Sequence, residues 1–209
     1  GIVEAATGTG KTMVAVEALR RLLSSQRNLV CVVCVHTVVL LEQWDKVLKA
    51  NLPGVVIARM GGGHKEDFSK SAKCRVLITT AQSFHSVMTE TLKPFKKLKW
   101  KTFLVVDECH HYEYAKVFRT IPRQFSWDFR LGLSATLNDS TDYLEGLEEV
   151  VHSYSILDAI EDKVIPSFDL HNLSVELTRT ERREYKQISG MISYLQPHID
   201  RMIRVYLGA

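Results

Sequence analysis

Hydrophobic residues along the chain follow two alternating patterns. Short, almost unbroken apolar runs are typical of strands that are covered on both faces of a sheet. We expect such strands at residues 29–35, 55–58, 76–79, 103–106 and 130–133. Between them, apolar residues recur every three or four positions, as in the stripe from Ala15 to Leu23, and this pattern predicts helices. The alternation predicts an α/β fold with a parallel sheet flanked by helices.

The alternation weakens after about residue 153. Residues 164–177 are expected to be extended chain, with a bulge or break near Asn172. Thr178 and Glu181 then form a capping-box pattern, which predicts a helix that runs toward Leu195 and is interrupted by Pro197. We therefore expect one domain over residues 1–155 and a bridge over 156–209 that leads away from it.

Composition limits the class of protein without identifying it. The 209 residues are 45% hydrophobic and 24% charged, which allows a large core and does not indicate disorder. A net charge of +3 falls short of a dedicated basic arm for nucleic acid. No apolar run reaches the roughly 20 residues of a membrane span, and no signal peptide is visible. We expect a cytoplasmic protein (nuclear if the source is eukaryotic) whose true N-terminus has been cut away, since Gly1 is not Met.

Several features have two interpretations each. Cys31 and Cys34 could form a metal or redox pair, but their apolar run favours buried thiols in a reducing compartment. The basic segment 92–101 could contact nucleic acid, and a solvated connector is favoured. The glycines at 61–63 favour a turn over a backbone approach to nucleic acid. Trp44 lies on an apolar helical face, so core packing is favoured over stacking on a base.

The segment AATGTGKT, at residues 5–12, has the composition of a phosphate-binding loop. Gly8 and Gly10 allow the backbone to approach an anion. Lys11 can reach the β- and γ-phosphates of a nucleotide, and the Thr12 hydroxyl can ligate Mg²⁺. A helix follows directly, so the N–H groups of its first turn would face the phosphates. Almost nothing precedes the loop, so we expect its supporting strand to be clipped and the loop to be less ordered.

A second motif, LVVDECHH, begins inside the predicted strand at 103–106. Asp107 at the strand tip can hold Mg²⁺, directly or through water. Glu108 can position and deprotonate a water for attack on the γ-phosphate. On their own these two acids could simply end a strand. Combined with the loop, they supply the parts that phosphoryl transfer requires and predict a P-loop NTPase that uses ATP and Mg²⁺.

Together with LGLSAT at residues 131–136, the two motifs resemble motifs I, II and III of superfamily 2 helicases and translocases of the DExH kind. Their order is that of the first RecA-like domain, and Ala5 at the start of motif I is usual there. Residues 35–44 and 78–83 resemble motifs Ia and Ib, although His36 stands where the superfamily usually has Pro.

The C-terminal part carries a further resemblance. Residues 158–170 and 175–188 are similar to the bridge between motor domains in XPB-type repair translocases and the type III restriction-subunit group. The sequence SATL at residues 134–137 also fits XPB-type enzymes. The arginine usually found shortly afterwards is missing, and Asn138 and Asp139 occupy that stretch.

The resemblance implies roles at the nucleotide site. The nucleotide would be bound by Ala6, Thr7, Gly8, Thr9, Gly10, Lys11 and Thr12. Thr12 and Asp107 would hold the metal. Lys11 and Glu108 would be catalytic, with Glu108 as the general base.

It also implies roles in the response to nucleic acid. The nucleotide site would be coupled to the nucleic-acid track by His110, Ser134, Ala135 and Thr136. Thr37 and Thr80 would contact the strand backbone, since short hydroxyl side chains suit phosphate contacts that read no sequence. Capping of strand ends and helices is the alternative for these two threonines. His111 has no role that we can assign.

No segment resembles the second motor domain, and the adenine-reading glutamine motif would lie before residue 1. We therefore expect the first motor domain of an ATP-dependent helicase or translocase, truncated at both ends and weakly active or inactive alone. Its partners would be nucleic acid, with DNA favoured over RNA, and a second RecA-like domain in cis outside this chain. A translocating motor subunit of a restriction complex, or a non-motor binding module switched by ATP, are the alternatives.

Overall fold

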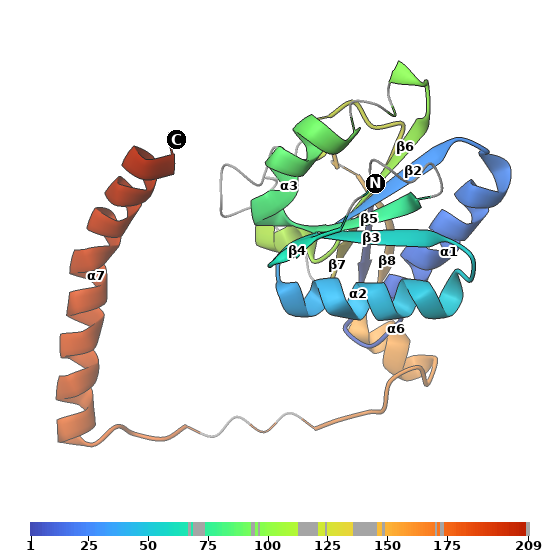
Figure 1. The fold of residues 1–209 in the computed structure, drawn as a ribbon. Coiled ribbons are helices and arrows are strands. Elements are labelled where there is room, and N and C mark those ends of the chain that lie inside the picture. The colour runs from blue at the N-terminus through green and yellow to red at the C-terminus, as the bar shows by residue number, and fades with distance from the viewer. Residues whose placement is uncertain are drawn as a thin grey trace. The chain divides into compact units, whose positions relative to one another are not determined.

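A sheet of eight strands forms the centre of the first part of the chain (Figure 1). The computed structural model describes residues 1–66, 68, 74–92, 95, 97–112, 121–123, 125–135, 146–147, 149–169, 171 and 174–207. The strands are β1 (Ile2–Ala5), β2 (Leu29–Val35), β3 (Val56–Gly61), β4 (His64–Lys65), β5 (Cys74–Thr80), β6 (Lys101–Val106), β7 (Phe129–Ser134) and β8 (Val150–Tyr154). Their order across the sheet is β4-β3-β5-β2-β6-β7-β1-β8. All neighbours pair in parallel except β3 and β4, which form an antiparallel hairpin.

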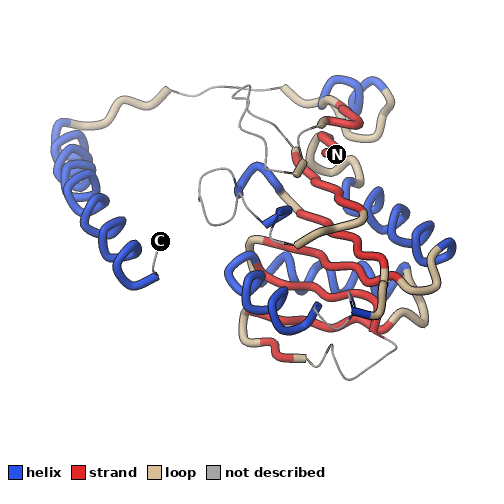
Figure 2. Tube along the Cα trace, turned by 90° about the horizontal axis from the view of Figure 1, so that it is seen from above, coloured by secondary structure: helices blue, strands red, loops and turns tan. Residues whose placement is uncertain are grey.

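Helices cover both faces of this sheet (Figure 2). The helical elements described are α1 (Lys11–Ser25), α2 (Val38–Asn51), α3 (Ala81–Val87), η1 (Met88–Leu92), η2 (Cys109–Tyr112), η3 (Ile121–Arg123), α6 (Ile156–Glu161) and α7 (Arg179–Leu207). Apolar side chains of α1 and α2 pack on one face, and those of α3 and η1 pack on the other. The expected α/β fold with a parallel sheet is confirmed.

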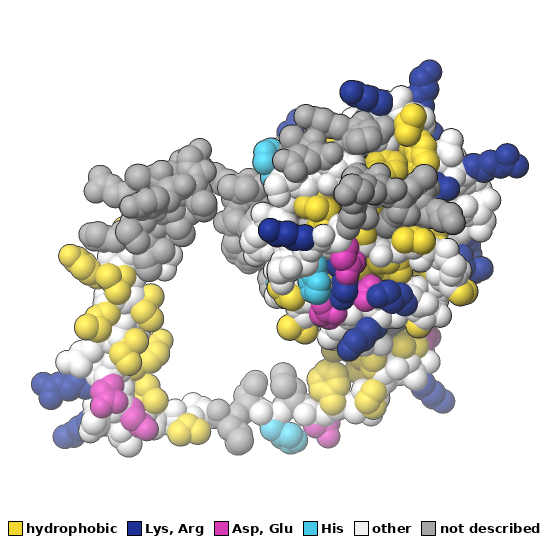
Figure 3. All heavy atoms as spheres, viewed as in Figure 1, with side chains coloured by type: hydrophobic (Ala, Val, Ile, Leu, Met, Phe, Trp, Pro, Cys, Tyr) yellow, Lys and Arg dark blue, Asp and Glu magenta, His cyan; other side chains and the backbone are white. Residues whose placement is uncertain are grey.

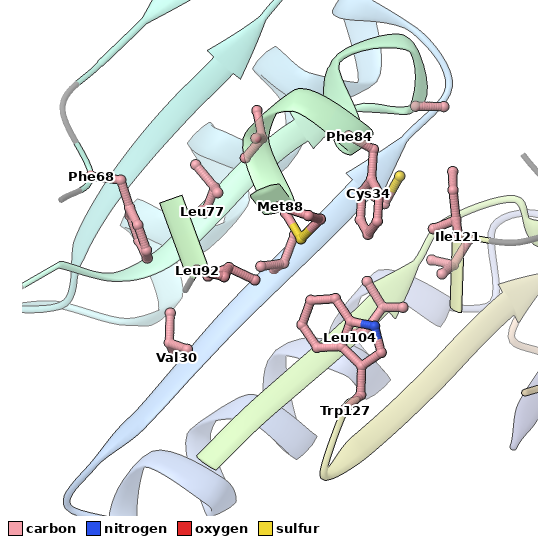
Figure 4. Packing of buried hydrophobic residues seen from close by; sticks show 14 of the residues in the cluster. Val30, Cys34, Phe68, Leu77, Phe84, Met88, Leu92, Leu104, Ile121 and Trp127 are labelled. Carbon is pink, nitrogen blue, oxygen red and sulfur yellow. The ribbon is translucent and has the colours of Figure 1, made fainter. Parts of the chain in front are cut away.

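Strand β2 shows why the run LVCVVCV is apolar at every position. Its residues alternate between the two faces, so Val30 and Val32 join the cluster under α3 while Cys31 and Val33 join the one under α1 and α2. Every residue of the strand is 0% exposed. Figure 4 shows the cluster on the α3 face, where Cys34 lies among apolar side chains.

The five predicted strands are present with small changes at their ends. The loop does have a supporting strand, because β1 pairs with β7 on one side and β8 on the other, and the expected lower order of the loop stays a prediction. Pairing and burial of Ile2 and Val3 support β1 despite its four residues. The pattern missed β8 and α6, which begins with a capping box between Ser155 and Asp158.

The buried interpretation of the cysteines is confirmed. Cys31 and Cys34 are free and 0% exposed, and burial raises the pKa of the Cys31 thiol far above its ordinary value. Within the described residues, no group of three His, Cys, Asp or Glu side chains could hold a metal ion. The structure thus gives no support to a metal or redox pair.

The predicted glycine turn is confirmed, whereas the connector over residues 92–101 stays a prediction. The glycines at 61–63 form the turn of the β3–β4 hairpin. In the basic segment, the rings of Phe95 and Trp100 pack at 5.0 Å, and the Arg75 guanidinium lies 4.4 Å from the Trp100 ring centroid. The Phe95 and Trp100 rings therefore pack against other side chains of the domain.

The chain divides into two compact units, residues 1–166 and 167–209. The first unit ends later than residue 155, because Ala159 of α6 is buried and the turn after α6 returns N–H groups to its carbonyl oxygen. The predicted division at 155 concerns the functions of the two segments and stays a prediction.

The second unit consists mainly of α7. The predicted capping box is confirmed, because the Thr178 N–H donates to the Glu181 carboxylate at 2.8 Å and the Glu181 N–H donates to the Thr178 hydroxyl at 3.3 Å. The predicted interruption is wrong, since α7 continues past Pro197 to Leu207. Loss of one N–H donor is tolerated inside a helix this long. Asn172 lies outside the described residues. Large apolar side chains of α7 remain exposed (Figure 3).

Candidate nucleotide-binding site

The carboxyl ends of five parallel strands bring the predicted site residues to one edge of the sheet. The loop of residues 6–10 follows β1, Thr37 follows β2, and Thr80 ends β5. Asp107 follows β6, and Ser134 ends β7. In parallel α/β sheets, ligands bind outside the carboxyl ends of the strands. Residues scattered over more than half of the sequence thus meet where such a fold binds its ligand.

The loop after β1 has the backbone of a phosphate cradle. Gly8 and Gly10 have φ angles of 87° and 93°, which favour glycine. Gly10 is the N-cap of α1 and has no side chain to cap the first turn, so an anion could accept from its N–H groups. The Thr9 hydroxyl donates to the Ala6 carbonyl oxygen at 2.6 Å and closes the turn.

Lys11 folds back over this loop. Its Nζ donates to the carbonyl oxygens of Ala5 at 2.8 Å and Ala6 at 3.4 Å, and the residue is only 9% exposed. The ammonium group therefore lies over the loop that would cradle a phosphate. A phosphate oxygen is a stronger acceptor than a carbonyl oxygen and could take over these contacts.

Asp107 is held at the tip of β6 from several directions. Its backbone N–H donates to the Cys34 carbonyl oxygen at 3.0 Å, which continues the ladder with β2. Its Oδ1 accepts from the Glu108 backbone N–H at 3.1 Å, and its Oδ2 accepts from the Trp44 indole N–H at 2.7 Å. The carboxylate is therefore fixed in orientation, and the residue is 6% exposed.

This environment changes the acidity of Asp107. Burial disfavours the charged form and raises the pKa of the carboxyl above its ordinary value, and the neighbouring Glu108 carboxylate raises it further. The Trp44 hydrogen bond and the charge of Lys11 act in the opposite direction and do not cancel burial. A cation beside Asp107 would compensate the buried negative charge.

Glu108 has a strained backbone and a buried carboxylate oxygen. Its φ of 47° lies in the left-handed region that non-glycine residues rarely adopt, and such outliers cluster at functional sites. Its Oε2 is buried and has no hydrogen-bond partner in the described part of the chain, although His110 Nδ1 lies 3.5 Å away. A buried oxygen of this kind suits a ligand or a water that the site would bind.

His110 connects the end of β6 to the end of β7. A hydrogen bond of 2.9 Å joins its Nδ1 to the Ser134 hydroxyl, with a direction set by the tautomer of the ring. The structure thus brings together two of the residues predicted to couple the sites. Ala135 lines the adjacent cavity, and Thr136 lies outside the described residues.

Two cavities flank this arrangement. One of about 310 Å³ is lined on one side by Thr12, Trp44 and Asp107. The other, of about 400 Å³, is lined among others by Thr7 and Glu108. A Thr hydroxyl and a carboxylate in one cavity are oxygen ligands, and Mg²⁺ at nucleotide sites takes one or two such ligands together with phosphates and waters. The residues present therefore fit a magnesium nucleotide.

The two threonines predicted to contact nucleic acid differ in their surroundings. The Thr37 hydroxyl accepts from the Leu40 N–H at 3.2 Å and caps α2 at an exposed position. Thr80 is 3% exposed, and its hydroxyl donates to Ser83 Oγ at 3.3 Å. A phosphate could reach Thr37 directly, whereas it could reach the Thr80 side chain only after neighbouring groups moved. Both contacts stay predictions.

Sequence reasoning missed the contact of Trp44 with the site. The predicted core packing is confirmed, since Trp44 is 2% exposed and packs with α1 and the sheet. Its polar edge, however, bonds to Asp107. An apolar helical position gives no sign of this, because the partner is 63 residues further along the chain.

Comparison with known proteins supports the fold and the family. The viral protein "Putative helicase 22" of Sulfolobus islandicus filamentous virus (isolate Iceland/Hveragerdi) is 26% identical over 141 residues, which is 65% of this chain and 24% of the relative. The chain thus spans about a quarter of that relative.

No described helix is both long and apolar enough to cross a membrane.

Three solved structures share the fold of the chain. The Sulfolobus solfataricus SWI2/SNF2 ATPase core in complex with dsDNA has a TM-score of 0.55 at 17% identity, over 69% of this chain and 30% of that one. The UvsW helicase from bacteriophage T4 has a TM-score of 0.55 at 21% identity, over 72% and 53%. The Type ISP restriction-modification enzyme LlaGI, solved with a DNA substrate mimic, has a TM-score of 0.58 at 18% identity, over 78% and 18%.

The comparisons thus support a RecA-like domain of superfamily 2. A family model described as "Type III restriction enzyme, res subunit" matches residues 1–139, which include the whole of the loop and acidic motifs. The chain belongs to the family of type III restriction enzyme res subunits.

Proposed function

We propose that this chain is the first motor domain of an ATP-dependent helicase or translocase that acts on nucleic acid, with duplex DNA favoured over RNA. The observation that carries the proposal is the convergence of the loop, Lys11, Asp107 and Glu108 at one edge of the sheet. Two structural neighbours solved with DNA or a DNA mimic support the choice of DNA.

Each residue has a defined part in this proposal. Lys11 would exchange its carbonyl contacts for the β- and γ-phosphates of ATP. Thr12 and Asp107 would hold Mg²⁺, which when bound would neutralise phosphate charge during transfer. Glu108 would orient the attacking water and accept its proton, a task that suits its unpaired oxygen.

A site at the edge of one domain needs another surface to close it. We propose a second RecA-like domain in cis, outside this chain, as that surface. The hydrogen bond between His110 and Ser134 would couple the conformation of the nucleotide site at Glu108 to that of the end of β7. With only one domain present, we expect the chain to bind ATP weakly and to hydrolyse it slowly.

A translocating motor subunit of a restriction complex is the second candidate. The description of the family model and the similarity to LlaGI favour it. Such a motor would move along duplex DNA without separating its strands. An assay that scores strand separation and displacement of a third strand on the same DNA would distinguish it from a helicase. A non-motor module switched by ATP would neither separate the strands nor displace the third strand.

Two substitutions test the nucleotide site. In Lys11→Ala, affinity for a fluorescent ATP analogue should fall about tenfold or more, because a charge-assisted contact with phosphate is lost. In Glu108→Gln, affinity should stay within about twofold, whereas hydrolysis should fall about 100-fold or more. Titrations with Mg²⁺ and single-turnover hydrolysis at high protein concentration measure both quantities.

Lys97→Ala is the matched control, since Lys97 is exposed and lies before the amino end of β6, away from the loop. It should behave as the unsubstituted chain does. Unchanged affinity in Lys11→Ala would count against the loop as the phosphate site. Hydrolysis at the unsubstituted rate in Glu108→Gln would show that another group is the general base.

A further inference from the structure

Trp44 makes an unusual contact for a core residue. It is 2% exposed, yet its Nε1 lies 2.7 Å from Asp107 Oδ2. That length is typical of a hydrogen bond to a charged acceptor, which is about twice as strong as a neutral one. The contact joins the middle of α2 to the tip of β6, so it depends on the tertiary fold.

The bond fixes the direction in which Asp107 presents its oxygens. The Trp44 indole N–H donates to one lone pair of Oδ2, and the Glu108 backbone N–H donates to one lone pair of Oδ1. Each carboxylate oxygen has two lone pairs, so one on each oxygen remains for another partner. Because Asp107 also lines the cavity that contains Thr12, a free lone pair can serve a ligand there.

Helix α2 connects this contact to Thr37, which is exposed at the start of the helix. The helix begins after Thr37, and Trp44 follows two turns later, about 10 Å along the axis. Leu40, Gln43 and Val47 of the same helix line the cavity with Trp44 and Asp107. A displacement of α2 would therefore move the indole and, through the hydrogen bond, the carboxylate.

We propose that Trp44 is the positioning residue for Asp107: its indole N–H orients the carboxylate toward a magnesium nucleotide and makes that orientation depend on the position of α2. This role rests on the proposed function, because it concerns the same nucleotide site. Trp44 would act through Asp107 and would not touch the nucleotide or the metal.

The experiment compares two buried tryptophans. Trp44→Phe keeps an aromatic ring and removes the N–H. Trp127→Phe is the matched control, because Trp127 is 7% exposed, packs among apolar side chains and has a buried indole nitrogen without a hydrogen-bond partner among the described residues (Figure 4). Both changes leave a similar gap in a core, but only the first removes a contact with Asp107.

The first readout is the affinity for a fluorescent ATP analogue, measured with Mg²⁺ and in excess chelator. Trp44→Phe should weaken binding with Mg²⁺ about tenfold, the loss expected of one hydrogen bond to a charged group, and leave binding in chelator within about twofold. Trp127→Phe should change neither. A purely structural role of Trp44 would weaken both conditions alike, and that result would overturn the proposal.

The second readout needs no nucleotide. The indole N–H groups give separate signals in a ¹H–¹⁵N NMR spectrum, assigned by the two variants. In Asp107→Asn, the Trp44 signal should move because its acceptor loses its charge, and the Trp127 signal should stay. An unmoved Trp44 signal would also overturn the proposal. If the unsubstituted chain binds no nucleotide, the proposed function fails; if it binds and Trp44→Phe binds equally well with Mg²⁺, only the positioning role fails.

Discussion

At the scale of single residues, Asp107 shows a conflict between stability and chemistry. Its carboxylate is buried and fixed by two N–H donors, and burial still raises its pKa. A carboxyl whose pKa is higher in the folded state than in the unfolded state makes folding less favourable once the pH is high enough to ionise it. The site therefore reduces the stability of the domain at neutral pH.

We expect Asp107→Asn to raise the thermal unfolding midpoint at neutral pH, because removal of the buried charge should outweigh the loss of one acceptor: the amide oxygen can still accept from Trp44, but the NH2 group cannot accept from the Glu108 N–H. The gain should develop as the pH rises from the ordinary pKa of an aspartate, about 4, toward the raised value, and it should vanish below that window. Thermal scans from pH 3.5 to 8 measure the difference. A difference that stays constant with pH would contradict the role of ionisation.

The sequence predicted this site unevenly. The loop residues and the acids at the strand tip were predicted as site residues because their chemistry lies in short contiguous motifs. The hydrogen bond from Trp44 and the left-handed φ of Glu108 were not, because both depend on how distant segments pack. Periodicity reveals which face of a helix is buried, but not which polar atom a buried ring will meet.

At the scale of elements, the turn between β3 and β4 is fixed by close packing. Gly61 has a φ of 103°, and a Cβ there would lie 2.6 Å from Thr80 Oγ1 and 2.7 Å from Ser83 Oγ. The turn therefore fits against the start of α3 only without a side chain. Gly63 has a similar φ of 93°, but a Cβ there would meet nothing within 4 Å.

These two glycines form a matched pair. Gly63→Ala should cost about 1–2 kcal/mol of unfolding free energy for its backbone conformation alone. Gly61→Ala should cost the same amount plus about 1–3 kcal/mol, because Thr80 and Ser83 must move. Urea denaturation of both variants measures the difference. Equal losses would mean that the turn is free to shift away from α3.

The elements that were missed share a physical reason. Strand β8 lies at the edge of the sheet and is partly exposed, so its sequence lacks the unbroken apolar run of a central strand. Helix α6 has only six residues, which is too short for a clear period. Pro197 caused the opposite error, a predicted interruption where the helix continues, since one proline does not end a helix of 29 residues.

At the scale of the whole molecule, the two compact units differ in what they bury. The two hydrophobic clusters described lie entirely within residues 1–166. In the second unit, none of the described side chains is buried. The stability of the chain should thus reside in the first unit, which also contains the whole match to the family model.

Removal of residues 167–209 should leave the thermal unfolding midpoint within about 3 °C of that of the whole chain, because less than about 1 kcal/mol should be lost. The affinity for ATP should be equally unaffected. Differential scanning calorimetry and the nucleotide titration test both statements. A large loss of stability would contradict the assignment of the stability to the first unit.

The parallel arrangement also gives the domain one side that lies away from the candidate nucleotide loop. The connections that enter β2 and β6 from residues 26–28 and 97–100 lie at the edge opposite to the nucleotide loop, and Lys97, Leu98 and Lys99 are exposed there. A tether or a reporter placed on that edge would leave the site open. The domain could therefore be held on a surface by the side opposite the candidate nucleotide loop while single molecules are followed as they meet ATP.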